Sequence, residues 1–409
     1  MKRTLGEVGA AATQNAPPPR PLPRHCEPAA ARRHPAAPAP PRLTRLLALA
    51  LLLTSVLAAI VFAPMACGGT SHGSGGSGGK VTIRVLYAGS LIIPFAELQK
   101  RFEELHPDIK INGEGHGSIQ VLRQVSDIHE EADVLISADS QLIPMLLYDA
   151  KDPQTCKPYG TWRIDFATNE MALAYTGRSK YASQLTSDDW YDIVRRPDVR
   201  LGLADPRFDS NGYRALMMFA LAGRQYDKPA LFFDTFDGQF TSPITAQDDS
   251  TQTVIHVPEI LETSSGSHIV MRGYSVQLLP LLESGDIDYS IEYLSVIKQH
   301  GLEYLTLPPE VNLGDQTLAA TYKRARVDLD YQRFASVTPI FEGQPITYSL
   351  TIPSNAAQPE AAAQFVQFLI GPEGRSIMEK DYHPMLSQPL CDNLDALPQE
   401  LKGLVAPAK

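Results

Sequence analysis

Residues 81–90 read VTIRVLYAGS, an apolar strand that ends in small residues and a hydroxyl group. A helix with one apolar face is expected to follow, with Ser90 as its N-cap and an end at residues 106–107, His-Pro. A second extended segment starts at residue 108. A strand, a helix and a strand at this spacing require parallel pairing, and helices cover both faces of a parallel sheet. The sequence therefore predicts an α/β fold with a doubly wound sheet.

The same kind of junction recurs twice. Residues 108–118, DIKINGEGHGS, run through glycines to Ser118 and a helix, and residues 132–140, ADVLISADS, end a third strand with Ser137. Ligands of open α/β sheets bind outside the carboxyl ends of the strands, where helix N-termini offer unpaired N–H groups. Ser90, Ser118 and Ser137 are therefore candidate donors to an oxyanion, with ordinary N-capping as the alternative role of each.

A fourth junction places an acidic side chain before a helix. Residues 199–204, VRLGLA, are expected to form a strand, and Asp209 precedes a helix of about twelve residues. Gly212 allows a close backbone approach at its start. Asp209 is thus a candidate site residue, with N-capping or turn formation as its alternative role.

A glutamate follows another predicted strand. Residues 287–291, IDYSI, are expected to form a buried strand that leads directly to Glu292. A carboxylate that is buried without a partner is costly. Either a ligand meets Glu292, or the side chain forms a buried ion pair with Arg214 or Arg272.

Two long extended stretches divide the chain into lobes. Residues 162–176, WRIDFATNEMALAYT, and residues 345–353, PITYSLTIP, are each expected to cross from one lobe to the other. The predicted architecture is two doubly wound α/β lobes joined by two crossover strands, with the ligand between them. The expected limits are 81–165 for the first part of lobe 1, 166–334 for lobe 2, and 335–409 for the return crossover and the second part of lobe 1.

The N-terminal residues indicate export. Residues 1–44 are rich in proline, alanine and arginine, and we expect a disordered basic leader. Residues 45–66 contain the uncharged run LLALALLLTSVLAAIVF, which is long for a signal peptide and short for a membrane-spanning helix. Positive charges precede this run, so the rest of the chain is expected on the outer face of the membrane.

A cysteine follows the apolar segment. Ala66 stands directly before Cys67, which resembles the processing box of bacterial lipoproteins. Cys67 is therefore a candidate lipidation site, and an uncleaved membrane helix or a plain export signal are the alternatives. Residues 67–80 form a Gly/Ser linker with a reach of roughly 20 Å. A domain on such a linker is expected to work beside the membrane.

The charge of the chain limits its partners. The formal net charge is −10, and residues 1–66 hold eight basic residues against two acidic ones, so the rest of the chain is more acidic than the whole. An acidic exported domain argues against nucleic acid as a partner, because nucleic acid binding needs a basic surface. A small buried anion remains compatible, since it senses nearby N–H dipoles more strongly than screened surface charges.

The cysteines and histidines contain no catalytic or metal-binding motif. His116 lies near Ser118, but the nucleophile elbow G-x-S-x-G is absent around this serine. The histidines are scattered without the pair spacing of a zinc site. Cys156 and Cys391 form either a disulfide, which an oxidising compartment permits, or two separate thiols. We therefore expect neither an enzyme nor a bound cofactor.

Several motifs together resemble a known family. The stretches that carry the resemblance are AGS (88–90), GS (117–118), ADVLISAD (132–139), NEMALAYT (169–176), GYR (212–214), LLESGDIDYSIEY (281–293) and KQHGLEYLTLP (298–308). Through them, and over essentially all of residues 81–409, the chain is similar to the tungstate/molybdate-binding proteins of ABC importers. The resemblance implies a type II periplasmic-binding-protein fold, a tetrahedral dianion of molybdenum or tungsten as the ligand, and the membrane subunits of an ABC permease as partners. We expect a monomer.

The resemblance also implies roles for single residues. Ser90, Ser118 and Ser137 match the family's hydroxyl and N–H donors to the oxide oxygens. Asp209 and Glu292 match two carboxylates that, in part of this family, bind the metal directly and complete six-fold coordination.

One loop departs from the family pattern. The family often has a proline and a cysteine between the acid and Gly-Tyr-Arg, whereas this chain has Ser210 and Asn211. The register of Asp209 is unchanged, and Ser210 or Asn211 becomes a further candidate donor to the ligand.

Two other functions stay open from the sequence. A receptor of the same fold could take sulfate, phosphate or an organic anion instead. An exported enzyme could use Asp209 and Glu292 as a carboxylate acid/base pair, although no nucleophile motif accompanies them.

Overall fold

The computed structural model describes residues 80–330 and 339–408. Its largest sheet has seven strands in the order β16-β15-β4-β14-β3-β1-β2, and we call this sheet with its helices the first lobe. β1 pairs in parallel with β2 and with β3, as predicted, whereas β14 is antiparallel to β3 and β4. The strands are β1 (Val81–Ala88), β2 (Ile109–His116), β3 (Val134–Ser137), β4 (Ile164–Thr168), β14 (Thr347–Thr351), β15 (Met385–Cys391) and β16 (Ala406–Pro407).

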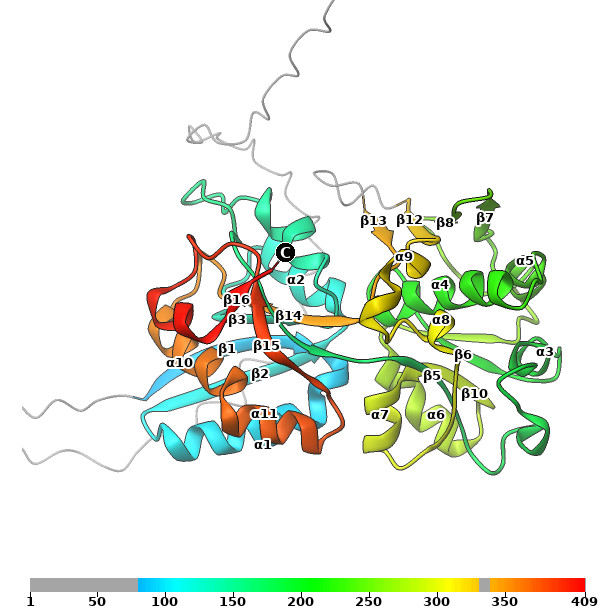
Figure 1. The fold of residues 1–409 in the computed structure, drawn as a ribbon, viewed down its shortest axis with the longest axis horizontal. Helices are drawn as coiled ribbons and strands as arrows, with labels where there is room; N and C mark the ends of the chain where they lie inside the picture. Colours follow the sequence, from blue (N-terminus) through cyan, green and yellow to red (C-terminus); the bar gives the residue numbers. More distant parts are fainter. Residues whose placement is uncertain (1–79, 331–338, 409) are drawn as a thin grey trace, which may run out of the picture. The chain divides into compact units, whose positions relative to one another are not determined.

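Aromatic side chains pack the helices of the first lobe together. α1 (Ile92–Leu105) buries Phe95 and Phe102, and both rings meet Phe365 of α10 (Pro359–Ile370) edge to face. The apolar face predicted after residue 90 therefore forms part of the core. The other helices of this lobe are α2 (Ser118–Ser126) and α11 (Pro372–Lys380) (Figure 1).

The second lobe is built on a five-stranded sheet with the order β11-β5-β10-β6-β9. β6 is parallel to both β10 and β9, and β5 is antiparallel to β10 and β11. The strands are β5 (Met171–Tyr175), β6 (Leu201–Ala204), β9 (Ile269–Arg272), β10 (Tyr289–Tyr293) and β11 (Glu303–Thr306). The helices around them are α3 (Trp190–Val194), α4 (Ser210–Gln225), α6 (Leu279–Ser284), α7 (Leu294–Gln299), α8 (Pro309–Asn312) and α9 (Ala319–Tyr322).

The helix α4 begins at the predicted place and is buried over most of its 16 residues. Gly212 lies in its first turn, directly against the end of β6. A Cβ atom at this position would lie 2.5 Å from the carbonyl oxygen of Ala204 and 2.6 Å from the nitrogen of Pro206. The close backbone approach predicted for Gly212 is confirmed, and any larger residue would push the start of α4 away from the sheet.

The structure has a third sheet, which lies in the second lobe and was not predicted from the sequence. It has four strands in the order β13-β12-β8-β7, and α5 (Leu231–Phe236) precedes β7 in the chain. β8 is parallel to β12, and its Thr253 lies opposite Ala325. The strands are β7 (Thr245–Asp248), β8 (Thr253–Val257), β12 (Ala325–Leu329) and β13 (Ile340–Glu342).

The first crossover differs from its prediction. Residues 162–176 form two strands, β4 in the first lobe and β5 in the second, and not one long strand. Asn169 accounts for the break, because its side-chain oxygen accepts the N–H groups of Glu170 at 3.0 Å and of Ser295 at 3.3 Å. The second stretch, residues 345–353, contributes β14 to the first lobe alone.

The start of α1 and the end of β10 also differ from the sequence prediction. Ser90 lies inside the 3-10 turn η2 (Gly89–Leu91) and does not cap α1, whose N-cap residue is Leu91. β10 continues through Glu292 and Tyr293, because both residues keep strand pairing with β5. Glu292 is therefore a strand residue and does not stand beyond the end of the strand.

Other predictions concern the termini and the cysteines. The basic leader, the apolar segment, Cys67 and the predicted lobe limit at residue 334 lie outside the described residues. In the part of the chain that the structure covers, none of the helices is long and apolar enough to cross a membrane. Cys391 is a buried free thiol with its pKa raised by burial, and Cys156 is exposed. The structure thus favours thiols over a disulfide between them.

Candidate functional site

Buried polar side chains gather where the carboxyl ends of strands from both lobes meet. Ser90 and Ser118 follow β1 and β2 of the first lobe, while Asp209 follows β6 and Glu292 lies in β10 of the second. All four are at most 6% exposed. The lobes touch through the backbone at this place, since the N–H of Gln120 donates to the carbonyl of Phe208 at 3.3 Å. We call these residues and their hydrogen-bonded neighbours the polar cluster.

Ser90 joins the cluster through tyrosine and asparagine side chains. Its hydroxyl is 2.8 Å from the hydroxyl of Tyr348 in β14. The side-chain amide of Asn169 donates to the same tyrosine oxygen at 3.0 Å and to Ser295 at 2.7 Å. Ser90 is therefore held by a chain of hydrogen bonds that reaches the crossover between the lobes.

Ser118 contacts both lobes. Its Oγ accepts the N–H of Ala138 at 3.0 Å within the first lobe and the hydroxyl of Ser210 at 3.4 Å from α4 of the second. Ser210 in turn lies 3.0 Å from the hydroxyl of Tyr293. The structure thus gives Ser118 a role other than N-capping, because Gly117 is the N-cap residue of α2.

Ser137 behaves differently from the other two serines. Its hydroxyl donates to the carbonyl of Asp139 at 2.8 Å and accepts the N–H of Asp139 at 3.0 Å. Both bonds close the loop directly after β3. The residue is fully buried, and its hydroxyl serves its own loop.

Asp209 caps α4 and also reaches beyond it. Its Oδ1 accepts the N–H of Asn211 at 3.2 Å, so its predicted alternative role as an N-cap is confirmed. Its Oδ2 accepts the N–H of Ser275 at 2.9 Å, from the 3-10 turn η5 (Ser275–Leu278). Burial raises the pKa of Asp209, although these two N–H groups favour its charged form.

Glu292 is fully buried and only half satisfied. Its Oε1 accepts the N–H of Tyr293 at 2.7 Å and the side-chain amide of Asn211 at 3.2 Å. Its Oε2 makes no hydrogen bond of normal geometry among the described residues, although the nearby side chain of Ser275 favours its charged form, and the side-chain oxygen of Asn211 also has no partner. Burial, together with the nearby charge of Asp209, raises the pKa of Glu292 to about 8.

A buried ion pair with Arg214 or Arg272 was the alternative role predicted for Glu292, and this prediction is wrong. Arg214 donates to the carbonyl of Ala138 at 2.7 Å and pairs with Asp139 at 3.0 Å. Arg272 donates to the carbonyl of Met271. Neither guanidinium group contacts Glu292, because the first is held by the opposite lobe and the second lies near the surface.

The polar cluster is buried and contains more carboxyl groups than positively charged side chains. Two carboxyl groups approach each other while the nearest buried arginine, Arg214, is already paired with a third. Buried polar atoms without a partner are rare in folded proteins and point to an absent ligand or water. Within residues 80–330 and 339–408, no three His, Cys, Asp or Glu side chains are grouped to hold a metal ion.

Several members of the cluster were not predicted as site residues from the sequence. Tyr293 and Tyr213 lie in stretches quoted only for the family resemblance, and Tyr348 lies in a stretch interpreted only as a crossover strand. Their hydroxyls bond to Ser210, Asp139 and Ser90. The one signal in the sequence was the position of Tyr213 and Tyr293 beside predicted site residues, in GYR (212–214) and IEY (291–293), and Tyr348 has no such neighbour.

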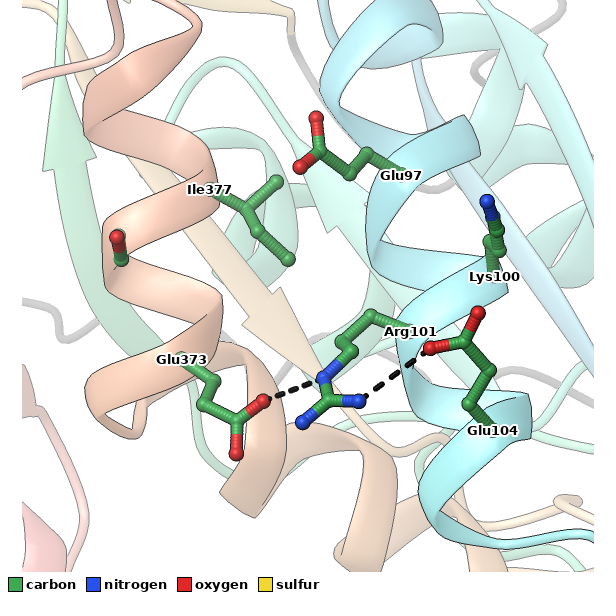
Figure 2. Close-up of a pocket in the computed structure, with 7 residues that line it drawn as sticks. Glu97, Lys100, Arg101, Glu104, Glu373 and Ile377 are labelled. Atoms are coloured by element: carbon green, nitrogen blue, oxygen red, sulfur yellow. Dashed lines mark hydrogen bonds and ion pairs between the residues drawn. The ribbon is translucent and has the colours of Figure 1, made fainter.

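A separate groove lies on the outer surface, between α1 and α11, with a volume of about 320 Å³. Figure 2 shows Arg101 between two acidic side chains: Nε is 2.6 Å from Glu373 Oε2, and Nη1 is 3.3 Å from Glu104 Oε2. These side chains are exposed and carry opposite charges, and exposed ion pairs contribute little to the free energy of folding. None of the predicted site residues lines this groove.

Comparison with known proteins gives consistent matches. A family model described as bacterial extracellular solute-binding protein matches residues 83–382. The molybdate/tungstate-binding protein WtpA of Thermococcus kodakarensis is 34% identical over 362 residues, which are 87% of this chain and 96% of that protein. An uncharacterized solute-binding protein of Petrotoga mobilis is 36% identical over 324 residues, or 79% of this chain and 89% of the relative.

Solved structures give weaker similarities. The periplasmic molybdate-binding protein of Azotobacter vinelandii aligns with a TM-score of 0.47 and 13% identity, over 75% of this chain and 100% of that chain. The sulfate-binding protein SubI of Mycobacterium tuberculosis aligns with a TM-score of 0.48 and 14% identity, over 80% of this chain and 93% of that chain.

Proposed function

Because the chain belongs to the family of bacterial extracellular solute-binding proteins, we propose that it captures molybdate or tungstate between its lobes and delivers the anion to an ABC permease. A family of solute-binding proteins is defined by capture and not by catalysis. The unpaired oxygen of the buried Glu292 is the observation that carries the choice of ligand.

The first lobe supplies donors to the oxide oxygens in this proposal. The hydroxyls of Ser90 and Ser118 lie at the ends of parallel strands, and α2 starts at Ser118. A hydroxyl can rotate its proton toward an anion, and the first N–H groups of a helix carry partial positive charge. Asn211 is a further donor in the proposed site, and Ser137 becomes one only when its loop opens and frees the hydroxyl from Asp139.

The second lobe supplies two acids, and their chemistry discriminates between anions. A carboxylate repels the oxide oxygens of a dianion, but it is attracted to the electron-poor metal that they surround. Molybdenum and tungsten can expand beyond four oxygen ligands, whereas sulfur in sulfate cannot. Asp209 and Glu292 would therefore complete six-fold coordination of a molybdenum or tungsten centre and exclude sulfate.

The relatives and the geometry support the same proposal independently. Two relatives named molybdate/tungstate-binding proteins cover most of this chain at 34% identity. The polar cluster supports it by an argument that uses no relative, since Glu292 Oε2 is buried without a partner. The side-chain oxygen of Asn211 is a second such atom beside it.

Isothermal titration with tungstate, molybdate, sulfate and phosphate tests this function. We expect tight binding of tungstate and molybdate, each at one site per chain, and no heat beyond dilution for sulfate and phosphate. Tungstate heats equal to those of buffer would overturn the proposal. Binding of sulfate with comparable affinity would keep a receptor but remove the role of the two acids.

The proposed place of action is the outer face of the cell membrane. An apolar segment and Cys67 precede the solute-binding domain, and they support attachment either by a lipid on Cys67 or by an uncleaved helix at residues 45–66. Mass spectrometry of the membrane-extracted protein distinguishes these, because lipidation removes residues 1–66. A Cys67→Ser variant that stays in the membrane fraction would indicate the helix.

A further inference from the structure

The carboxylate of Asp139 connects the two lobes. It follows β3 of the first lobe and is fully buried. Its Oδ1 accepts the N–H of Gln141 at 2.8 Å and the side chain of Gln344 at 3.2 Å. Its Oδ2 accepts the hydroxyl of Tyr213 and lies 3.0 Å from Nη2 of Arg214, both in α4 of the second lobe. One oxygen thus holds the loop and the other holds the opposite lobe.

Arg214 adds a second bond across the same interface. Its Nη1 donates to the carbonyl of Ala138 in the first lobe at 2.7 Å and to the hydroxyl of Tyr293 in its own lobe at 2.8 Å. The side chain is 2% exposed. Tyr293 directly follows Glu292, so the arginine links the contact between the lobes to the proposed acid side of the site.

We propose that Asp139, Tyr213 and Arg214 form a closure latch, which holds the lobes together and sets the rate at which a captured solute is released. None of these three residues is among the proposed ligand contacts. The latch concerns the closed arrangement of the lobes and does not depend on which anion is bound.

The energetics of buried charge make the latch specific to the closed form. When the lobes separate, water can hydrate both Asp139 and Arg214, which offsets part of the attraction lost with the pair. When Asp139 is neutralised, the closed form keeps a buried guanidinium without its counter-charge, while the open form hydrates it. Removal of one partner therefore penalises closure far more than it penalises the fold of either lobe.

The N–H of Gln120 provides a reporter of closure that needs no ligand. It lies in the first turn of α2, where the helix offers it no acceptor, because the first helical bond runs from Val121 to Gly117. Its bond to the carbonyl of Phe208 crosses the lobes and exists only when they are closed. Hydrogen exchange at this amide therefore measures the closed population directly.

The test compares Asp139→Asn and Tyr213→Phe with the wild type in the full chain. We expect exchange at Gln120 to become faster in the unliganded protein, and dissociation of tungstate to become about 100-fold faster in Asp139→Asn and about tenfold faster in Tyr213→Phe. Association rates should change little. Tyr213→Phe removes one hydrogen bond without leaving a buried charge, so it keeps the test valid if Asp139→Asn fails to fold.

Asp288→Asn is the matched control. Asp288 is a buried carboxylate that accepts the N–H groups of Lys180 at 3.1 Å and Arg200 at 2.8 Å, all within the second lobe. It should lower thermal stability without changing exchange at Gln120. The latch is wrong if the Asp139 and Tyr213 variants only lose thermal stability, as this control does. If tungstate fails to bind, the exchange result still decides the latch while the proposed anion fails.

Discussion

The polar cluster has a donor half, the serine hydroxyls of the first lobe, and an acid half, the carboxyl groups of the second lobe. The two halves differ in how many of their hydrogen bonds the protein itself provides. On the first lobe, the hydroxyls of Ser90 and Ser118 have protein partners at 2.8 and 3.0 Å. On the second lobe, Glu292 is buried with one oxygen unpaired and with its pKa raised to about 8 by burial. Each hydroxyl of the donor half has a protein partner, whereas the acid half has unused coordination capacity. Selectivity is therefore expected to come mainly from the acid half.

The largest effect is expected from Glu292→Gln. The substitution keeps the shape of the side chain but replaces a potential metal ligand by a neutral amide, and loss of a buried interaction with a charged group costs about 1.5 to 3 kcal/mol. Tungstate affinity measured by isothermal titration should fall about 100-fold. Glu170→Gln is the control, because Glu170 accepts the side chain of Asn312 outside the cluster. Equal affinities in Glu292→Gln and wild type would make the acid structural.

The pH dependence of binding should be the next largest effect. With a pKa of about 8, Glu292 is mostly protonated at neutral pH, and a metal bond needs the carboxylate. Tungstate affinity should therefore rise about tenfold per pH unit below 8 and level off above it. Titrations in buffers of different ionisation enthalpy should show proton release. Proton uptake, or a flat profile, would mean that Glu292 stays protonated and donates to an oxide oxygen.

The raised pKa of Glu292 should also make the free energy of unfolding of the unliganded protein depend on pH. Because the folded pKa lies above the ordinary value of 4.5, the folded state binds more protons than the unfolded state between these values. This contribution is fully present below pH 4.5 and is lost as the pH rises through 8. Chemical denaturation at pH 6 and pH 9 should show this loss in the wild type and a smaller one in Glu292→Gln, and equal losses in the two proteins would contradict the raised pKa of Glu292.

A moderate effect is expected from the donor half. Ser118→Ala removes an oxygen that accepts the N–H of Ala138, and it also removes a potential donor to the anion. Binding of tungstate should weaken by about 1 to 3 kcal/mol. Titration calorimetry with the variant measures this loss directly. A loss larger than that of Glu292→Gln would reverse the ranking of the two halves.

The smallest effect is expected from Ser137→Ala. The hydroxyl of Ser137 is bonded at both ends to the backbone of Asp139, so it is less available to a ligand than that of Ser118. Thermal stability should fall by about 1 kcal/mol, and tungstate affinity should fall less than in Ser118→Ala. An affinity loss equal to that of Ser118→Ala would show that the loop opens to present this hydroxyl.

Local patterns in the sequence were sufficient to predict the main helices and strands. The βαβ unit from residue 81 and the helix starts at Ser118 and Ser210 depend on neighbouring residues, so they could be predicted. The limits of α10 (Pro359–Ile370) are local in the same way, because proline marks its start and Gly371 its end.

Contacts between distant residues could not be predicted in the same way. The pairing of β8 with β12 joins Thr253 to Ala325, and nothing near either residue signals it. Asp139 likewise meets Arg214 from another lobe, which removed the expected partner of Glu292. The roles of the predicted ligand residues stay predictions, since they depend on a bound anion.

A crystal structure with bound tungstate tests the central claim most directly. The account predicts a tungsten atom between the lobes with six oxygen ligands, two of them from Asp209 and Glu292, and with the oxide oxygens facing Ser90 and Ser118. A four-coordinate tungstate whose nearest carboxylate oxygens lie beyond bonding distance of the metal would contradict it.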